Sequence, residues 1–163
     1  MIQGYTIRPF KHGDLGQVLY LHGLVYSSEH GFDLSFEGYV AAGIAEFACS
    51  FKEGKDQLWV AEADGQVAAS IAVFGRSESE AQLRWFIVHP AYRGLGMGKA
   101  LLKEALEFAK RCAYTTVFLW TLGHLDAARH LYKSAGFVLA EKKTHVLWGK
   151  LLTEERYDLS PNP

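Results

Sequence analysis

Apolar residues recur at helical spacing in four stretches of the chain. The clearest is Met97–Cys112, where apolar positions form one stripe and most of the lysines and glutamates lie off it. The stripe consists of Met97, Leu101, Ala105, Phe108 and Cys112. The other three helices are predicted at Asp14 to about Tyr26 with Asp14 as the cap, at about Phe36–Ser50, and at Asp126–Ala135 before Gly136. The second of these is expected to bury Tyr39, Val40, Ile44 and Phe47.

Strand patterns account for most of the remaining chain. Tyr5–Pro9 predicts a short first strand, and Ser27–Ser35 predicts a loop between the first two helices. Three strands then follow in series, the first two joined by an Asp64-Gly65 hairpin turn: Leu58–Ala63, Val67–Phe74 and Gln82–Val88. Later strands are expected at Thr116–Thr121, Phe137–Ala140 and Val146–Leu151, with E-K-K-T joining the last two. The polar tail from Thr153 is expected to extend beyond the core.

The predicted order of elements is β-α-α-β-β-β-α-β-α-β-β. An antiparallel meander that continues into a β-α-β crossover indicates an α/β (α+β) protein: a mixed, twisted central sheet with helices on both faces. The length of 163 residues fits a single domain, 1–163.

Composition narrows the class of protein. The chain has 17 basic and 18 acidic residues, without the basic surplus of a nucleic-acid binder. Its longest apolar stretch, Val67–Phe74, is too short to span a membrane, and the N-terminus lacks the apolar core of a signal peptide. Cys49 and Cys112 form no C-x-x-C pair, and His124 and His130 form no metal signature. We therefore expect a cytoplasmic protein that binds no nucleic acid, membrane or metal.

The glycine-rich segment 93–99, R-G-L-G-M-G-K, carries the chemical signal. It lies between a strand and an amphipathic helix, where glycines and free N–H groups of the helix start can hold a phosphate. The spacing does not match a Walker loop, because Arg93 stands where the first glycine is required. A dinucleotide fingerprint also fails, since its last position falls on Lys99 or Leu101.

The spacing that fits is R-x-x-G-x-G, formed by Arg93, Gly96 and Gly98. About 35 residues later, the stretch from Ala128 through Leu131, Tyr132 and Gly136 to Phe137 fits A-x-x-L-Y-x-x-x-G-F. With these two motifs in order, the chain resembles the GNAT N-acetyltransferases over nearly its whole length. L-R-W-F-I-V, F-L-W-T, W-G and E-R-Y look closest to the acetyltransferase half of proteins fused to a MarR-type DNA-binding domain. The DNA-binding domain of those proteins is expected to be absent here, because the acetyltransferase pattern already begins at Tyr5.

The resemblance implies how acetyl-CoA, as co-substrate, is bound. Its pantetheine arm would lie along the backbone of Phe86, Ile87 and Val88, and the following strand would splay away near Leu119–Thr121. Its pyrophosphate would be wrapped by Arg93, Gly94, Leu95, Gly96, Met97, Gly98 and Lys99. Leu125 and Ala128 would also contact it, although Leu125 stands where the family often has Asn, with His124 and Asp126 as the nearest polar substitutes.

Tyr132 aligns with the family's general acid, which protonates the departing CoA thiolate. A phenol with a pKa near 10 remains a proton donor at neutral pH. Ala128, Leu131, Tyr132 and Ala135 also form one helical stripe, so a purely structural role for Tyr132 is the competing interpretation.

The acceptor would be a primary amine, on a small molecule or on a protein, that enters beside the first two helices. Glu29 and Trp85 are the predicted acceptor-site residues, with Phe32 and Tyr39 as further candidates. Gln82 stands where some members carry a glutamate base. The choice of base therefore stays open among Glu80, Glu29, His22, His89, a water chain and no dedicated base at all. An acyl-CoA-binding sensor without turnover is the alternative function, and a nucleotide-binding regulator is a third. A homodimer is allowed for.

Overall fold

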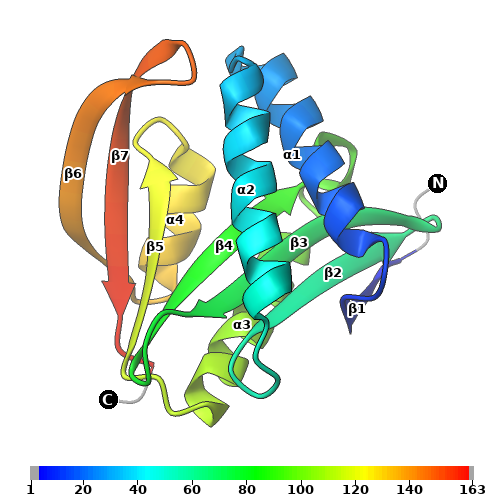
Figure 1. The fold of residues 1–163 in the computed structure, drawn as a ribbon, viewed down its shortest axis with the longest axis vertical. Helices are drawn as coiled ribbons and strands as arrows, with labels where there is room; N and C mark the ends of the chain where they lie inside the picture. Colours follow the sequence, from blue (N-terminus) through cyan, green and yellow to red (C-terminus); the bar gives the residue numbers. More distant parts are fainter. Residues whose placement is uncertain (1–3, 162–163) are drawn as a thin grey trace.

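One seven-stranded mixed sheet runs through the part of the chain that the structure, a computed structural model, describes, residues 4–161 (Figure 1). The strand order in the sheet is β1-β2-β3-β4-β5-β7-β6. The elements along the chain are β1 Thr6–Pro9, α1 Asp14–His30, α2 Leu34–Ser50, β2 Gln57–Ala63, β3 Gln66–Gly75, β4 Glu80–Val88, a 3-10 turn Pro90–Tyr92, α3 Met97–Arg111, β5 Thr116–Leu122, α4 Asp126–Ser134, β6 Val138–Leu147 and β7 Lys150–Leu159. The predicted fold class and element order are confirmed.

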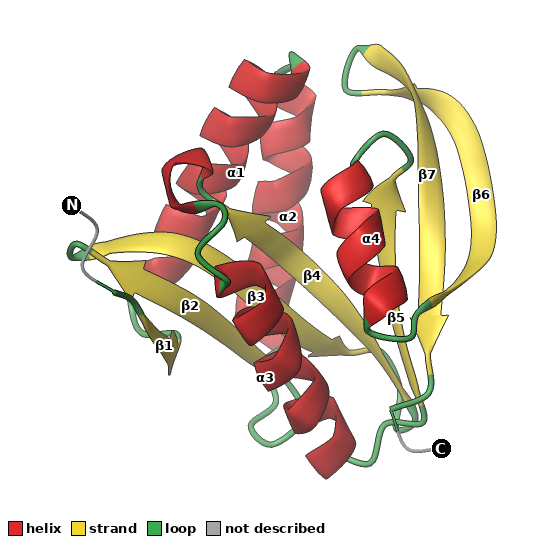
Figure 2. Cartoon of the chain, turned by 180° about the vertical axis from the view of Figure 1, so that it is seen from behind, coloured by secondary structure: helices red, strands yellow, loops and turns green. Residues whose placement is uncertain are grey.

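The helices cover both faces of the sheet. Helices α1 and α2 lie on the face toward the viewer in Figure 1, and α3 and α4 lie on the opposite face, seen in Figure 2. Alternate residues of β2 accordingly enter two cores: Trp59 and Ala61 pack with α3, whereas Leu58 and Val60 pack with α1 and α2. This alternation is the period-two pattern of a strand that is buried on both sides.

The sheet splits between β4 and β5, which are its parallel pair. Only Glu80, Ala81 and Gln82 of β4 are paired with β5, at Thr116, Val117 and Phe118. Beyond Gln82 the two strands diverge, as Figure 2 shows. The splay predicted near Leu119–Thr121 is therefore present, and it leaves one edge of the second half of β4 without a neighbouring strand.

The first two helices are longer than the sequence predicts. Helix α1 continues to His30, beyond the expected end near Tyr26, and it ends at Gly31 with a positive φ of 65°. Helix α2 begins at Leu34 because the Asp33 carboxylate caps it, accepting a hydrogen bond from the Ser35 N–H at 3.0 Å. The predicted loop Ser27–Ser35 therefore shrinks to three residues, 31–33.

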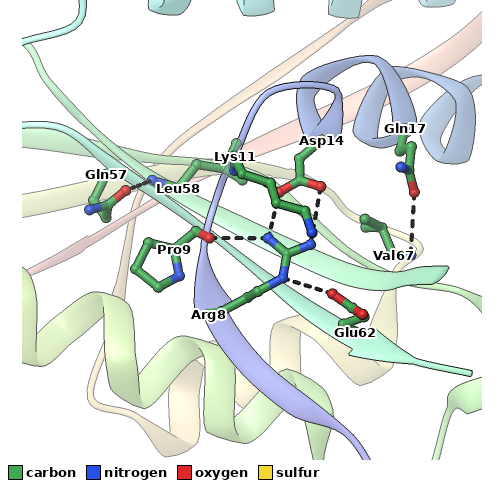
Figure 3. Close-up of polar contacts among 9 residues, drawn as sticks. All are labelled: Arg8, Pro9, Lys11, Asp14, Gln17, Gln57, Leu58, Glu62 and Val67. Carbon is green, nitrogen blue, oxygen red and sulfur yellow. Dashed lines mark hydrogen bonds and ion pairs between the residues drawn. The ribbon is translucent and has the colours of Figure 1, made fainter. Parts of the chain in front are cut away.

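Asp14 does not cap α1, which corrects the sequence prediction. Figure 3 shows its carboxylate accepting hydrogen bonds from Arg8 Nη1 at 2.7 Å and from the Lys11 N–H at 2.8 Å. Arg8 also donates to Glu62 at 2.8 Å. Asp14 thus ties the start of α1 to β1, and the cap position belongs to Gly13.

The end of the chain differs most from the prediction. E-K-K-T lies inside β6, and the turn is formed by Trp148 and Gly149, whose φ angles of 53° and 82° suit a two-residue hairpin. Nearly every residue of edge strand β6 is exposed, so it carries no alternating apolar signal. Residues 153–159 of the predicted tail lie within β7, which pairs with β5, and Tyr157 is fully buried; residues 162–163 lie outside the described residues.

Candidate active site

A cavity of about 550 Å³ lies among β4, the glycine-rich loop, α1 and α4, and we call it the larger cavity. Most of the residues that the sequence assigns to acetyl-CoA line it: Phe86, Ile87, Val88, Arg93, Gly94, Gly96, Met97, Gly98, Leu125, Ala128 and Tyr132. His124 and Asp126, the polar neighbours of Leu125, line it as well. Leu95 and Lys99 lie outside its wall, and both are exposed. The structure thus brings together two motifs that are far apart in sequence.

The wall on the β4 side is a free strand edge. Ile87 and Val88 pair with Ser70 and Ala69 of β3, whereas their other edge faces the gap left by β5. Backbone groups along an unpaired edge can hydrogen-bond an extended ligand as a neighbouring strand would.

The glycine-rich loop exposes backbone at the start of α3. Gly94 and Gly96 have φ angles of 80° and 83°, which other residues rarely adopt. Gly96 caps the helix without a side-chain hydrogen bond, and the first turn of a helix has N–H groups without intrahelical partners. A Cβ at Gly98 would lie 3.6 Å from Phe86 and 3.7 Å from Leu131, residues of the cavity wall. These are ordinary van der Waals distances, so a methyl group at this position would line the wall without a clash.

Glu29, a predicted acceptor-site residue, lines the larger cavity and not the smaller one. Its carboxylate forms an ion pair with Arg93 at 2.9 Å, which links the end of α1 to the glycine-rich loop. His30 and His124 also line this region, with Nδ1 and Nε2 3.3 Å apart. Sequence analysis singled out neither His30 nor this histidine pair.

Tyr132 stands where the larger cavity meets a second one. Its side chain is 6% exposed, and its ring packs against Phe86, Phe137 and Tyr157 with centroids 6.0, 5.9 and 6.4 Å away. Its hydroxyl has no hydrogen-bond partner among residues 4–161, yet no fully buried side-chain polar atom in that range is unsatisfied. The oxygen therefore reaches the cavity. Burial, together with nearby Tyr26, raises the pKa of Tyr132 well above its usual value, so the phenol keeps its proton.

An ionic network fixes the helix that carries Tyr132. Arg129 of α4 donates to Glu155 of β7 at 3.0 Å and to the Gly123 carbonyl at 2.9 Å. Tyr157 donates to the same Glu155 at 2.8 Å. Because Glu155 is buried and doubly bonded, it holds α4 against β7 and sets the position of Tyr132.

The second, smaller cavity has a volume of about 150 Å³ and lies between β4, α2 and the β6–β7 turn. Phe86, Tyr26, Leu125, Ala128 and Tyr132 line both cavities. Trp85 lines the smaller one and also belongs to the core beneath α2.

A bulge in β4 shapes this wall. Ala72 pairs with Arg84 and Ser70 with Ile87, so β4 contains one residue more than β3 over this interval. Trp85 adopts a positive φ of 48°, and its carbonyl accepts a hydrogen bond from the buried Ser70 hydroxyl at 2.6 Å. The bulge places both Arg84 and Trp85 on the α2 side, although neighbouring residues of a regular strand face opposite ways.

The opposite wall is aromatic. Trp148 in the β6–β7 turn contacts Phe36 and Tyr39 of α2, with ring centroids 5.0 and 5.4 Å apart. Tyr39 is 51% exposed, which corrects its predicted place in the core. Phe32, another acceptor-site candidate, is a core residue and does not line the cavity.

His22 and Tyr26 bring polar groups of α1 to the smaller cavity. His22 Nδ1 lies 2.8 Å from the Val18 carbonyl, so Nδ1 carries the proton and Nε2 is an acceptor. Burial lowers the pKa of His22 to about 4, which keeps the imidazole neutral. Burial raises the pKa of Tyr26 to about 12. Sequence analysis missed Tyr26, because it fell at the expected end of its helix.

The other candidate bases are engaged elsewhere. Glu80 contacts Arg156 at 3.5 Å, and His89 Nδ1 accepts a hydrogen bond from the Ala91 N–H at 3.0 Å. Gln82 accepts two hydrogen bonds from Arg76, at 2.9 and 2.8 Å. Of the candidate bases, His22 alone lines the smaller cavity.

Two negative observations apply to residues 4–161. No group of three or more His, Cys, Asp or Glu side chains in that range is arranged to hold a metal ion. None of its helices combines the length and apolar character of a transmembrane segment.

The larger cavity fits an acyl-CoA. A free strand edge suits the amide groups of a pantetheine arm, and a glycine-opened helix start suits a pyrophosphate. Arg93 lies at the rim in its ion pair with Glu29, and the apolar wall of Val25, Leu125 and Leu131 suits an alkyl chain.

The acetyltransferase (GNAT) family matches residues 12–137 of this chain. N-acetylaspartate synthetase of Xenopus tropicalis is 35% identical over 109 residues, which are 61% of this chain and 40% of that protein. The chain spans about half the length of the curated relatives it matches.

Solved structures share the fold. An acetyltransferase from Streptococcus agalactiae 2603 superposes with a TM-score of 0.79 at 21% identity, covering 97% of this chain and 99% of that one. A Salmonella typhimurium acetyltransferase solved with acetyl-CoA gives a TM-score of 0.75 at 19% identity, covering 98% and 95%. The chain therefore belongs to the acetyltransferase (GNAT) family.

Proposed function

We propose that this protein transfers the acetyl group of acetyl-CoA to a primary amine by direct attack, with both substrates bound together. One observation carries the proposal: the larger and the smaller cavity meet at Tyr132, whose hydroxyl is free to contact a ligand. The larger cavity would hold the co-substrate and the smaller one the amine. Bound acetyl-CoA supplies the acetyl group as a thioester, whose leaving group is a thiolate.

Tyr132 then acts as the general acid. Its raised pKa keeps the phenol protonated at neutral pH, so the O–H can donate to the departing sulfur. The three aromatic contacts hold the ring in place, and the Arg129–Glu155 network holds its helix.

His22 receives a hydrogen bond from the incoming amine in this proposal. Its Nδ1 is committed to the Val18 carbonyl, so the unprotonated Nε2 is the nitrogen left for the smaller cavity. The depressed pKa makes His22 a weak base, which suits orienting a neutral amine better than storing a proton.

Thiol release tests the proposal. Purified protein is mixed with acetyl-CoA and with one amine at a time from a panel. The panel contains simple amines, amino acids, amino acid amides and polyamines, and at least one of these should cause release of CoA. Acetyl-CoA should raise the melting temperature, whereas ATP and NAD should not, because the loop matches neither nucleotide motif. Binding of acetyl-CoA without release by any amine would favour the sensor function. Stabilisation by ATP or NAD alone would favour the nucleotide-binding regulator.

Four further expectations remain proposals. They are the single domain over 1–163, the cytoplasmic location, the homodimer, and the likeness to the acetyltransferase half of MarR-type fusion proteins.

A further inference from the structure

We propose that Arg84 selects the acceptor: it binds the carboxylate of a small amino acid whose amine is acetylated at the junction of the two cavities. This inference names the substrate class of the proposed function and rests on it. Arg84 lies on β4 and lines the smaller cavity, two residues before Phe86, which lines both cavities.

The Arg84 guanidinium is held in place by neutral groups. It stacks over the Trp85 ring at 4.7 Å and donates from Nη2 to the Tyr39 hydroxyl at 3.2 Å. A Cβ added at Gly43 of α2 would lie 2.9 Å from Nη2, so the missing side chain at Gly43 makes room for the guanidinium. The β4 bulge, α2 and Tyr39 together therefore hold the Arg84 guanidinium in a defined position.

Arg84 has no negative partner of its own. Five other arginines in residues 4–161 form ion pairs with carboxylates: Arg8, Arg76, Arg93, Arg129 and Arg156. Arg84 forms none, although burial lowers the pKa of its guanidinium by disfavouring the charged form. A partly buried cation without a counter-ion is costly unless a ligand supplies the charge.

Among the described residues that line the smaller cavity, Arg84 carries the one positive charge. His22 is neutral there, and the single carboxylate of the wall, Glu154, is bonded to His145 at 2.6 Å. A guanidinium offers a planar fork that matches a carboxylate through two parallel hydrogen bonds. The cavity is thus equipped for an anionic group on the acceptor.

The spacing along β4 limits the size of the acceptor. Two residues span at most roughly 7 Å of backbone, and the bulge at Trp85 shortens this span, so Arg84 lies close to the Phe86 wall where the cavities join. The amine and the acidic group must then belong to one small molecule. A free amino acid has this arrangement, whereas a lysine side chain within a protein carries no carboxylate near its amine.

The experiment compares amino acids with their α-amides. CoA release is measured with alanine, aspartate, methionine and phenylalanine, and with the corresponding amides, for the wild type and Arg84→Gln. We expect at least one amino acid to exceed its amide in kcat/KM by roughly tenfold or more, because the amide leaves the guanidinium unpaired. In Arg84→Gln the ratio should approach one, mainly through KM, while acetyl-CoA affinity stays unchanged. Amides used as well as every amino acid by the wild type, or an unchanged ratio in Arg84→Gln, would overturn the proposal.

Two further variants separate this role from a loss of fold or of overall charge. Arg111→Gln removes a positive charge from an exposed arginine at the end of α3 and should keep the wild-type ratio. Gly43→Ala keeps Arg84 but crowds its guanidinium, so it should lower the ratio while alanine, a better helix former, maintains the melting temperature.

The outcome also separates this inference from the proposed function. If amides and simple amines release CoA but amino acids do so no better, the acetyltransferase activity stands and the role of Arg84 fails. If no amine releases CoA, the proposed activity fails. In that case, the melting temperature of the CoA-loaded protein tests whether Arg84 binds a carboxylate. The amino acids must raise this temperature in the wild type and must not raise it in Arg84→Gln.

Discussion

The two cavities that meet at Tyr132 are built from different parts of the chain and recognise their contents in different ways. The larger one presents mainly backbone: the free edge of β4 and the N–H groups at Gly96. The smaller one presents side chains from α1, α2, β4 and the β6–β7 turn, such as His22, Tyr39, Arg84 and Trp148. Backbone groups are the same whatever the sequence, so the larger cavity suits a shared co-substrate. On the proposed assignment of the acceptor to the smaller cavity, selectivity for the acceptor comes from these side chains.

The largest expected effect concerns the tyrosine at the junction. Tyr132→Phe removes one oxygen and keeps the three aromatic contacts of the ring. If the phenol protonates the departing sulfur, kcat should fall by about 10²–10⁴-fold, while acetyl-CoA affinity and melting temperature change little. CoA release at saturating acetyl-CoA measures the first quantity, and calorimetric titration measures the second.

Tyr26→Phe is the matched control for this variant. Tyr26 also lines both cavities and also keeps its proton, with a pKa raised to about 12 by burial. It should retain most of the turnover. Wild-type turnover in Tyr132→Phe, with the loss found in Tyr26→Phe instead, would move the general acid from α4 to α1.

The second expected effect is a pH dependence of stability that comes from His22 in the smaller cavity. Burial holds the pKa of His22 at about 4 in the folded protein, below the value near 6.5 of an unfolded chain. The folded state therefore favours neutral His22, and its contribution is complete above about pH 6.5 and is lost as the pH falls toward 4. The difference corresponds to about 3 kcal/mol of unfolding free energy.

Denaturant unfolding at pH 7 and pH 4.5 measures this contribution. The loss of stability at the lower pH should be smaller in His22→Asn, since asparagine can still donate to the Val18 carbonyl but does not titrate. His12→Asn, at an exposed histidine, should lose as much stability as the wild type. An equal loss in His22→Asn would show that the imidazole is not held neutral in the fold.

The same contrast explains what the sequence could predict. A site built from backbone needs glycines at fixed positions, and Gly94, Gly96 and Gly98 stand at every second position of one short segment. The residues of the smaller cavity come from distant elements, and each alone resembles an ordinary core or surface residue. The sequence marks Arg84 in one way, since it is a charged residue inside the apolar run L-R-W-F-I-V. No sequence pattern indicates the bulge that turns Trp85 to the same side as Arg84.

The fold shows the same division. The sequence predicts the meander and α3 to within two residues, because α3 has one clean apolar period and the strands β2 and β3 are apolar runs separated by the Asp64-Gly65 turn. The hairpin of β6 and β7 was misplaced, because an exposed edge strand has no apolar alternation and its turn, Trp148-Gly149, lacks the Asn-Gly or Asp-Gly signature. The sequence places Glu155 in a polar tail, whereas in the structure it is buried and accepts hydrogen bonds from Arg129 and Tyr157.

The smallest expected effect tests the backbone side of the comparison. Gly96→Asp places a carboxylate at the start of α3, where the pyrophosphate is expected to meet free N–H groups. We expect acetyl-CoA to bind at least tenfold more weakly, which is about 1.4 kcal/mol. Calorimetric titration of acetyl-CoA measures the affinity.

Gly96→Asn separates charge from backbone strain in this test. Both residues must adopt the positive φ of 83° at this position, and aspartate and asparagine tolerate that conformation about equally. A Cβ there would meet only the Tyr5 hydroxyl, 3.9 Å away, so neither variant should prevent folding. The asparagine variant should therefore show the strain alone, and the additional loss in Gly96→Asp should report repulsion of the pyrophosphate. If the two variants bind acetyl-CoA equally well, the pyrophosphate does not lie over this helix start, and the larger cavity needs another orientation for its ligand.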